Sequence, residues 1–354
     1  MDTSTMDYED FLELLNSTLE DNETISVNFV KLCHKKEVNQ FGSQFLPTFY
    51  YCMFLFSLLG NVLVLYIMRR YEKLNTVTNT FLLNLVVSDL VFTFSLPFWA
   101  AYHSSQWIFG RLLCKLVGGL YFVGFYSSIL FLTLMTFDRY LAVVHAVVAS
   151  RKRKKTYALV SLAVVWCVSI LATFKEFLLF DVRNSANYGT LCEESHTSNE
   201  LLAKWQVAGD YQQFFLFFLF PLTVVLYCYI RIAVRILSLR MTKKFRVVKI
   251  IFVIVATFFI CWSPYNVVII LKALKTGTNS DLCEDSLDYA LYITRNLSYL
   301  YFCINPIFYT FVGKKFRNHF QKILAENILC INNPFSASQS SKTSSQKNPE
   351  SVYE

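Results

Sequence analysis

Long apolar runs follow one another along the chain and are separated by shorter polar stretches. Seven runs are found, and they cover residues 45–68, 79–101, 112–144, 157–180, 211–238, 247–271 and 287–312. The hydrocarbon core of a bilayer is about 30 Å thick and needs roughly 20 mostly apolar residues per helix, which each run supplies. The period-two alternation that is typical of a membrane β-barrel is absent from the runs. The pattern therefore predicts an all-α membrane protein with a bundle of seven transmembrane helices.

Basic residues gather in every second loop between these runs, at 69–73, 151–155, 240–249 and 314–317. The positive-inside rule makes these loops cytoplasmic, so the amino terminus is extracellular and the carboxyl terminus cytoplasmic. Composition agrees with a membrane protein, since 55% of residues are hydrophobic and only 16% are charged. We expect a multi-pass plasma-membrane protein with four parts. These are an extracellular tail (1–44), the bundle (45–312), a short amphipathic cytoplasmic helix (313–330) and a disordered Ser/Thr-rich tail (331–354).

The extracellular tail is acidic and has no Lys or Arg before Lys31. Such a segment cannot bury a core, so we expect it to be disordered. It carries two glycosylation sequons, at Asn16 and Asn22, and Tyr8 has the acidic neighbours expected of a sulfated tyrosine. An acidic arm suits a basic protein ligand, because charge steers the encounter and the arm can become ordered on binding. The alternative is a solvated tail without a partner.

Four cysteines fall on the oxidising, extracellular side: Cys33, Cys114, Cys192 and Cys283. They allow three disulfide pairings. We favour Cys114 with Cys192, which ties the third helix to the second outer loop, and Cys33 with Cys283, which ties the tail to the seventh helix. On the cytoplasmic side, Cys330 is either a palmitoylation site or an unmodified thiol.

Polar residues inside apolar runs are costly and point to function. Asp89 lies in the middle of the second run, and Asn61, Ser128 and Asn305 lie at similar depths in the first, third and seventh. A carboxylate ringed by amide and hydroxyl oxygens can hold a sodium ion or a proton. Prolines inside the runs remove backbone hydrogen bonds and allow kinks, so the helices around this cluster can repack.

Several short motifs carry a resemblance to a known family. They occur in order along the chain, each on its expected helix: "GNVLV" with Asn61, "LNLVVSDL" with Asp89, Asp138-Arg139-Tyr140, Trp166, Pro221, "CWSPY" with Trp262 and Pro264, and "NPIFY" from Asn305 through Pro306 to Tyr309. This set resembles that of the rhodopsin-like G protein-coupled receptors, over roughly residues 30–330. The resemblance implies that Asp138 holds Arg139 in the resting state. On activation Arg139 would be released toward a heterotrimeric G protein, with Tyr229 and Tyr309 moving in beside it.

Further motifs are similar to those of the chemokine receptors: "SLPFWA", "QWIFG", "DRYLAVVHA", the two additional outer cysteines and the acidic tail. The stretches "LDYALYITRNL" and "FRVVKIIFVIVATFFICWSPYN" look closest to the XC-type receptor, whose ligand is lymphotactin. Two residues depart from the wider family, which mostly has Glu in place of Arg295 and Pro in place of Lys175. We therefore expect Arg295 to pair with Glu176 or Asp210, or to meet a carboxylate or backbone carbonyl of the ligand.

The resemblance implies a two-step mechanism, in which the tail and outer loops capture a chemokine and its amino terminus then enters the bundle. Besides Tyr8, the expected ligand-binding residues are Trp99, Tyr121, Phe125, Glu176, Asp210, Tyr265, Tyr289 and Arg295, although an aromatic stripe is more often core packing. Trp262 resembles the switch that passes ligand binding toward the cytoplasm. The implied intracellular partners are an inhibitory-class G protein, receptor kinases and arrestin, the last two acting on the serine-rich tail. No nucleic-acid partner is expected.

Other functional classes fit less well. A light-sensing pigment needs a Schiff-base lysine in the seventh helix, and 287–312 contains none. A transporter predicts internal repeats and broken helices, and no repeat is found. Catalysis is not expected, because the five histidines lie at or outside the membrane boundaries, and no cofactor is expected beyond the sodium ion. The remaining rival is a scavenging chemokine receptor that does not couple to a G protein.

Overall fold

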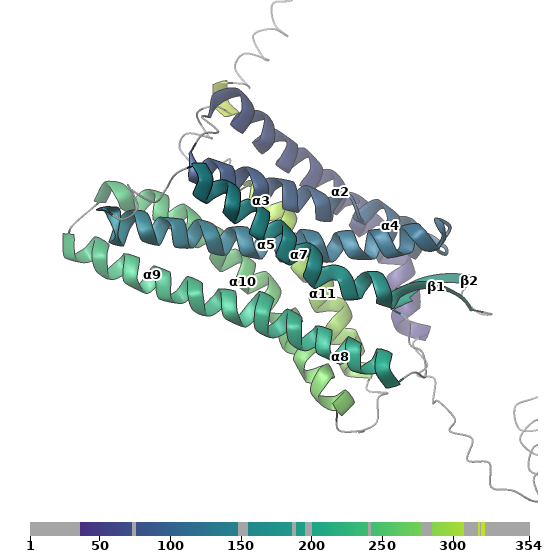
Figure 1. Cartoon of the computed structure of the whole chain (residues 1–354). Coiled ribbons are helices and arrows are strands. Elements are labelled where there is room, and N and C mark those ends of the chain that lie inside the picture. Colours follow the sequence, from purple (N-terminus) through teal and green to yellow (C-terminus); the bar gives the residue numbers. More distant parts are fainter. Residues whose placement is uncertain are drawn as a thin grey trace, which may run out of the picture. The chain divides into compact units, whose positions relative to one another are not determined.

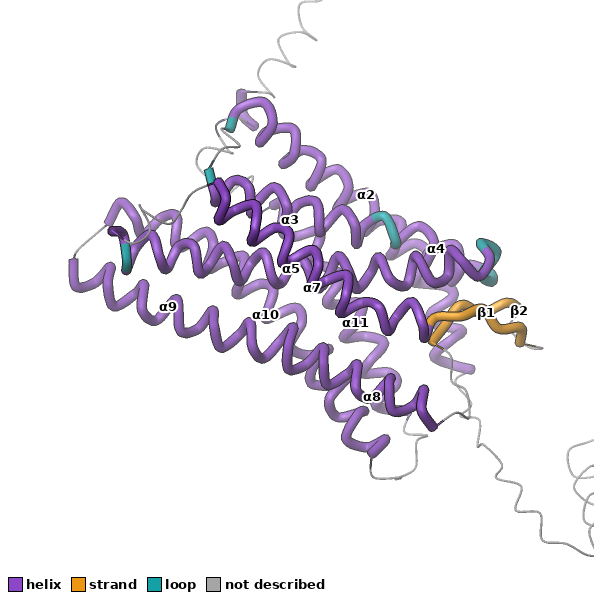
Figure 2. Tube along the Cα trace, in the orientation of Figure 1, coloured by secondary structure: helices purple, strands orange, loops and turns teal. Residues whose placement is uncertain are grey.

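A computed structural model describes residues 36–72, 76–147, 155–185, 189–194, 200–239, 242–277, 285–307, 318 and 320–322. It is a helical bundle with one short β-hairpin at one end (Figures 1 and 2). The elements are α2 (Lys36–Tyr71), α3 (Val77–Thr93), α4 (Leu96–Ser104), α5 (Gly110–Val144), α7 (Lys155–Leu179), β1 (Phe180–Ser185), β2 (Gly189–Glu194), α8 (Glu200–Phe214), the π-helix η1 (Phe215–Leu219), α9 (Phe220–Leu239), α10 (Thr242–Gly277) and α11 (Asp285–Ile307). Helix α5 is central, because it contacts α3, α7, α9, α10 and both strands.

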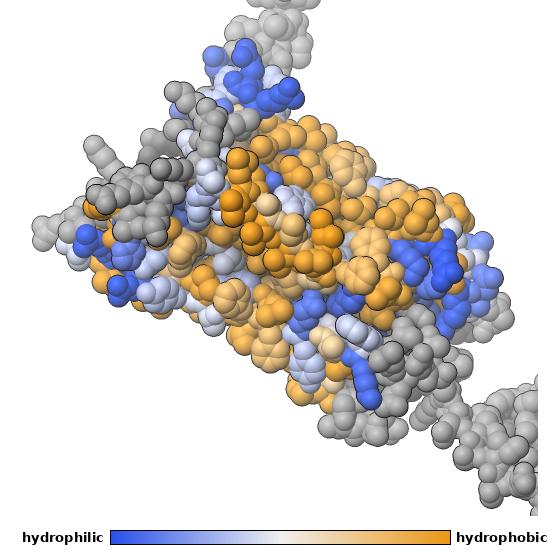
Figure 3. Space-filling model, in the orientation of Figure 1, coloured by the Kyte–Doolittle hydropathy of each residue, from blue (hydrophilic) through white to orange (hydrophobic). Residues whose placement is uncertain are grey.

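The helices confirm the predicted membrane bundle. Six stretches of the described chain are long and apolar enough to span a membrane: Ser43–Tyr71, Val77–Ser104, Gly110–Val144, Thr156–Leu179, Lys204–Ser238 and Val255–Lys275. Helix α11 is the seventh and packs against α2 and α10. Figure 3 shows apolar side chains over the middle of the visible face and hydrophilic ones toward both ends. Large apolar side chains such as Leu171 (73% exposed) and Phe56 (67% exposed) face outward, as expected of a surface that meets lipid tails.

Prolines interrupt two of the predicted helices. The second apolar run forms two helices, because α3 ends at Thr93 and α4 restarts at Leu96 with Pro97 in its first turn. A proline suits this position because the first turn of a helix does not use its N–H groups. In the fifth run, η1 ends at Leu219, two residues before Pro221, which cannot donate a backbone hydrogen bond. A proline and a π-bulge are both recognised causes of a kink in a helix.

Close helix packing places the central polar residues. A Cβ added to Gly124 on α5 would lie 2.7 Å from the backbone nitrogen of Phe92 and 2.9 Å from the carbonyl oxygen of Ser88 on α3. Only glycine therefore allows the backbones of α3 and α5 to approach this closely, as is common at helix interfaces in membranes. This approach brings Asp89 of α3 next to α5.

Candidate functional site

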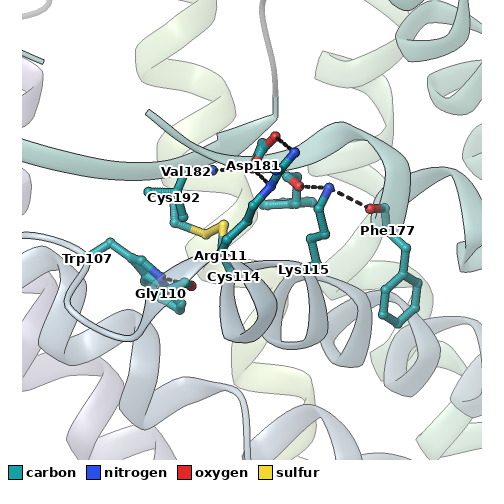
Figure 4. The surroundings of a disulfide bond; sticks show 10 residues. Trp107, Gly110, Arg111, Cys114, Lys115, Phe177, Asp181, Val182 and Cys192 are labelled. Atoms are coloured by element: carbon teal, nitrogen blue, oxygen red, sulfur yellow. Dashed lines mark hydrogen bonds and ion pairs between the residues drawn. A yellow bond between two sulfur atoms is a disulfide. The ribbon is translucent and has the colours of Figure 1, made fainter. Parts of the chain in front are cut away.

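The extracellular end of the bundle is organised by the hairpin of β1 and β2, which was not predicted. The disulfide between Cys114 and Cys192 joins β2 to the first turns of α5, with 5.7 Å between the Cα atoms, and it confirms one predicted pairing (Figure 4). Its predicted companion, Cys33 with Cys283, lies outside the described residues, as do Tyr8, Asn16, Asn22 and Cys330. The hairpin is thus tied covalently to the central helix.

Ion pairs and hydrogen bonds reinforce this tie (Figure 4). Two guanidinium nitrogens of Arg111 each lie 2.7 Å from a carboxylate oxygen of Asp181. Lys115 donates hydrogen bonds to the carbonyl oxygens of Phe180 (2.7 Å) and Phe177 (3.0 Å), where α7 passes into β1. Burial alone would raise the pKa of Asp181, but the hydrogen bonds from Val182 N–H and Arg111 outweigh it and hold the pKa below its usual value. The carboxylate therefore stays charged near neutral pH.

Aromatic side chains fill the space below the hairpin. Trp99 contacts the rings of Trp107 (5.9 Å between centroids) and Phe180 (6.1 Å). Deeper in the bundle, Phe125 stacks on Trp262 at 3.9 Å. Tyr265 lies one helical turn outward from Trp262, with its ring 6.0 Å away. The predicted switch tryptophan is therefore packed directly beneath the predicted ligand-binding residues of α5 and α10.

The guanidinium of Arg295 lies among tyrosines. It interacts electrostatically with the hydroxyl groups of Tyr50, Tyr121, Tyr265 and Tyr299, which come from α2, α5, α10 and α11. The ring of Tyr121 lies 5.5 Å from that of Tyr299. Tyr50 and Tyr299 were not predicted to belong to the site, because aromatic residues at helical spacing read equally well as core. Tyr289 is half-buried, and no described contact brings it to this group.

The two acidic residues proposed as partners of Arg295 lie elsewhere. Glu176 is fully buried and one of its carboxylate oxygens is 2.6 Å from the ammonium nitrogen of Lys175. Asp210 is half-buried and interacts electrostatically with Lys175, Lys272 and Glu194. Within the described chain, no ion pair joins Arg295 to either carboxylate. The predicted intramolecular pairing is therefore not what the structure shows, because the neighbouring Lys175 takes Glu176.

Asp89 lies in the predicted polar cluster. Ser128 donates a hydrogen bond to one carboxylate oxygen (2.7 Å), and the side-chain amide of Asn305 donates to the other (2.9 Å). The amide of Asn61 instead donates to the carbonyl oxygens of Ser57 (3.0 Å) and Phe302 (3.3 Å). The side-chain amide oxygens of Asn61 and Asn305 are buried without a hydrogen-bond partner. The contacts around Asp89 thus come from Ser128 and Asn305, whereas the described contacts of Asn61 are to Ser57 and Phe302.

At the cytoplasmic end, Asp138 and Arg139 form the predicted pair, with 3.7 Å between a guanidinium nitrogen and a carboxylate oxygen. Thr78 of α3 joins them. Its hydroxyl donates to Asp138 at 3.1 Å and contacts the guanidinium of Arg139. Thr78 was not predicted, because a threonine at the start of a helix reads as an ordinary polar boundary residue. The structure therefore holds Arg139 against both its neighbour and α3.

Tyr140 and Tyr229, two other predicted switch residues, pack in one apolar cluster next to this pair. Tyr140 has its hydroxyl 2.9 Å from the Nε2 atom of His145. Tyr229 on α9 packs edge-on against Phe252 of α10 at 5.2 Å. Pro264 and Pro306 lie inside α10 and α11. Tyr309 lies outside the described residues.

Residues 60–309 match the model of the family described as "7 transmembrane receptor (rhodopsin family)". The chain is 36% identical to the C-C chemokine receptor type 3 of Cavia porcellus in an alignment of 329 residues that covers 91% of each chain. It is 38% identical to the C-C chemokine receptor type 4 of Homo sapiens in an alignment of 307 residues that covers 86% of this chain and 84% of the relative.

Proposed function

Because the chain belongs to the rhodopsin family of seven-transmembrane receptors and, within it, to the chemokine receptors, we propose that it couples a chemokine outside to an inhibitory-class G protein inside. The observation that carries the coupling is the cytoplasmic lock of Asp138, Arg139 and Thr78. We infer that this charge pair, which the Thr78 hydroxyl joins to a second helix, is the two-state element that a receptor needs between its two binding sites.

The proposed ligand is a basic chemokine. The acidic tail and the anchored hairpin capture its folded body, and its amino-terminal segment then enters the outer half of the bundle. There it meets Trp99, Tyr121, Tyr265 and Arg295. Ligand binding needs only to favour the active arrangement over the resting one to shift the population. Trp262 of α10 stacks on Phe125 of α5, so a ligand that displaces one of these helices would also move the other.

Lymphotactin is the ligand we propose to test first. The sequence stretches of α10 and α11 that resemble the XC-type receptor support it. The relatives compared above are C-C chemokine receptors, so C-C chemokines belong in the same panel.

The cluster at Asp89 is proposed to bind a sodium ion in the resting state. Its oxygen donors suit a hard cation, and the two unpartnered amide oxygens of Asn61 and Asn305 are groups that a cation would satisfy. Bound there, a cation would neutralise Asp89 and hold α3, α5 and α11 together. Repacking of these helices on activation would release it.

Arg139 makes the scavenging alternative testable. Cells that express the chain are exposed to lymphotactin and a C-C panel, and inhibition of cyclic AMP is recorded with and without pertussis toxin. Our proposal predicts inhibition that the toxin removes and that Arg139→Ala abolishes without reducing surface binding. If a chemokine is bound and internalised while cyclic AMP stays unchanged, the protein is a scavenging receptor and the coupling proposal is wrong.

A further inference from the structure

Arg295 carries a charge for which the described part of the chain supplies no counter-ion. Its Nε atom is buried and has no hydrogen-bond partner there. Its electrostatic neighbours are phenol hydroxyls, which are dipoles and carry no compensating charge. Leaving an uncompensated cation at a desolvated position is costly, and the cost is removed by an anion that arrives from outside.

The two acidic side chains that were predicted to pair with Arg295 are engaged with lysines instead. Glu176 lies against Lys175, and Asp210 interacts with Lys175 and Lys272. The room for Lys175 depends on the opposite helix, because a Cβ added at Gly209 of α8 would collide with its ammonium group. Lys175 is thus the cationic partner of Glu176 and Asp210. Arg295, which lies among tyrosines, has no carboxylate partner in the described part of the chain.

The chemistry of Arg295 selects its ligand group. A guanidinium presents its N–H donors as a planar fork that matches the two oxygens of a carboxylate. Tyr50, Tyr121, Tyr265 and Tyr299 are at most 8% exposed, so the guanidinium lies among buried aromatic side chains whose hydroxyl groups interact with it. An acidic side chain on a flexible peptide fits this environment. A backbone carbonyl would leave the charge uncompensated.

We propose that Arg295 binds a carboxylate on the amino-terminal segment of the chemokine, so that an acidic residue of that segment determines which chemokines activate the receptor. The inference rests on the proposed function, since it assumes that a chemokine segment enters the bundle. It predicts selectivity for ligands with an acidic amino-terminal segment, and a carboxylate-to-amide change in the ligand should mimic the loss of Arg295.

A double-mutant cycle tests the contact. Wild-type receptor and Arg295→Gln are each titrated with lymphotactin, and with forms of it in which each acidic residue ahead of the first cysteine is changed in turn to its amide. For one such residue, we expect either single change to weaken binding by about tenfold or more. The double change should cost little beyond either alone. Arg295→Lys should restore only part of the affinity, because it returns the charge without the fork.

Arg183→Gln is the matched control. It removes the same charge from the same side of the membrane, but Arg183 is 58% exposed and already paired with Glu193 on the hairpin. Its effect should be independent of every ligand change. Surface labelling reports whether each variant is folded and displayed. The inference would be overturned if Arg183→Gln and Arg295→Gln showed the same coupling to a ligand change. It would also be overturned if Arg295→Gln weakened binding but no carboxylate-to-amide change in the ligand did.

A small probe separates this inference from the identity of the chemokine. Purified receptor is heated in the presence of phenylacetate, which offers a ring and a carboxylate, or of phenylacetamide, its neutral isostere. Phenylacetate alone should raise the melting temperature, and Arg295→Gln should remove the rise. If no chemokine of the panel binds, the proposed function has failed, and the two compounds still test whether Arg295 binds a carboxylate. Equal effects of phenylacetate and phenylacetamide on the melting temperature would reject the carboxylate site.

Discussion

Replacing Thr78 by valine should make the receptor active without ligand. Valine keeps the shape of threonine but removes the hydroxyl that lies between Asp138 and Arg139. Asp138 is fully buried and Arg139 is 20% exposed at its side chain, so water replaces little of what is lost. The resting arrangement loses this bridge between α3 and α5, whereas an arrangement with Arg139 released does not use it.

The size of the effect follows from the groups involved. A hydrogen bond to a charged group contributes roughly 1.5–3 kcal/mol. Each 1.4 kcal/mol is about a factor of ten in an equilibrium. The lower end of the range therefore predicts about a tenfold larger active fraction, as long as that fraction remains small. Since basal G protein activation is proportional to this fraction, it should rise by a similar factor.

The assay is basal GTPγS binding in membranes that contain equal amounts of receptor and an inhibitory G protein. Thr78→Ser keeps the hydroxyl and should leave basal binding near the wild-type level. Thr80→Val is the matched control, because Thr80 is two residues away and its hydroxyl donates to the carbonyl oxygen of Thr76, the N-cap residue of the same helix. Unchanged basal binding in Thr78→Val, or an equal rise in Thr80→Val, would refute the role of Thr78 in the lock.

Three further changes test other parts of the structure. Gly124→Ala forces α3 and α5 apart at the backbone of Phe92 and should cost about 1–3 kcal/mol of stability, seen as a lower melting temperature in detergent; an unchanged value would mean that the helices separate freely. Asp89→Asn should abolish the rise in melting temperature that sodium chloride gives over the same concentration of choline chloride, and a sodium effect that survives would place the ion elsewhere. The folded pKa of Asp181 is depressed, so the stability it contributes is fully present above its unfolded pKa of about 3.9 and is lost as the pH falls through the lower folded value. Binding of a chemokine between pH 5 and 8 should therefore be the same function of pH in wild type and Asp181→Asn, and a difference confined to that window would contradict the ion pair with Arg111.

The apolar pattern was sufficient to predict the bundle, because membrane thickness fixes the length of a spanning helix. The motifs shared with the family were sufficient to predict which polar residues contact one another at two places. Asp89 meets Ser128 and Asn305 as predicted, and Asp138 lies beside Arg139. The break before Pro97 follows from the missing N–H of proline, although its form as two helices was not foreseen.

What the sequence could not predict depends on how helices approach one another. Neighbouring residues of a helix normally point in different directions, so the pairing of Lys175 with Glu176 was not expected. Long side chains at the end of α7 can nevertheless turn toward each other. Thr78 reaches the charge pair only because α3 and α5 cross there. Asn61 binds the backbone of α11 at Phe302, which a pattern of polar residues does not specify.

The central claim is that a chemokine bound outside activates a G protein inside through this chain. The most direct measurement uses the purified receptor in lipid nanodiscs with an inhibitory G protein, and records chemokine-stimulated nucleotide exchange beside Arg139→Ala. We expect faster exchange with lymphotactin or a C-C chemokine of the panel, and no acceleration in the variant, which should still bind the ligand. Binding to the wild-type receptor with no change in the exchange rate would contradict it.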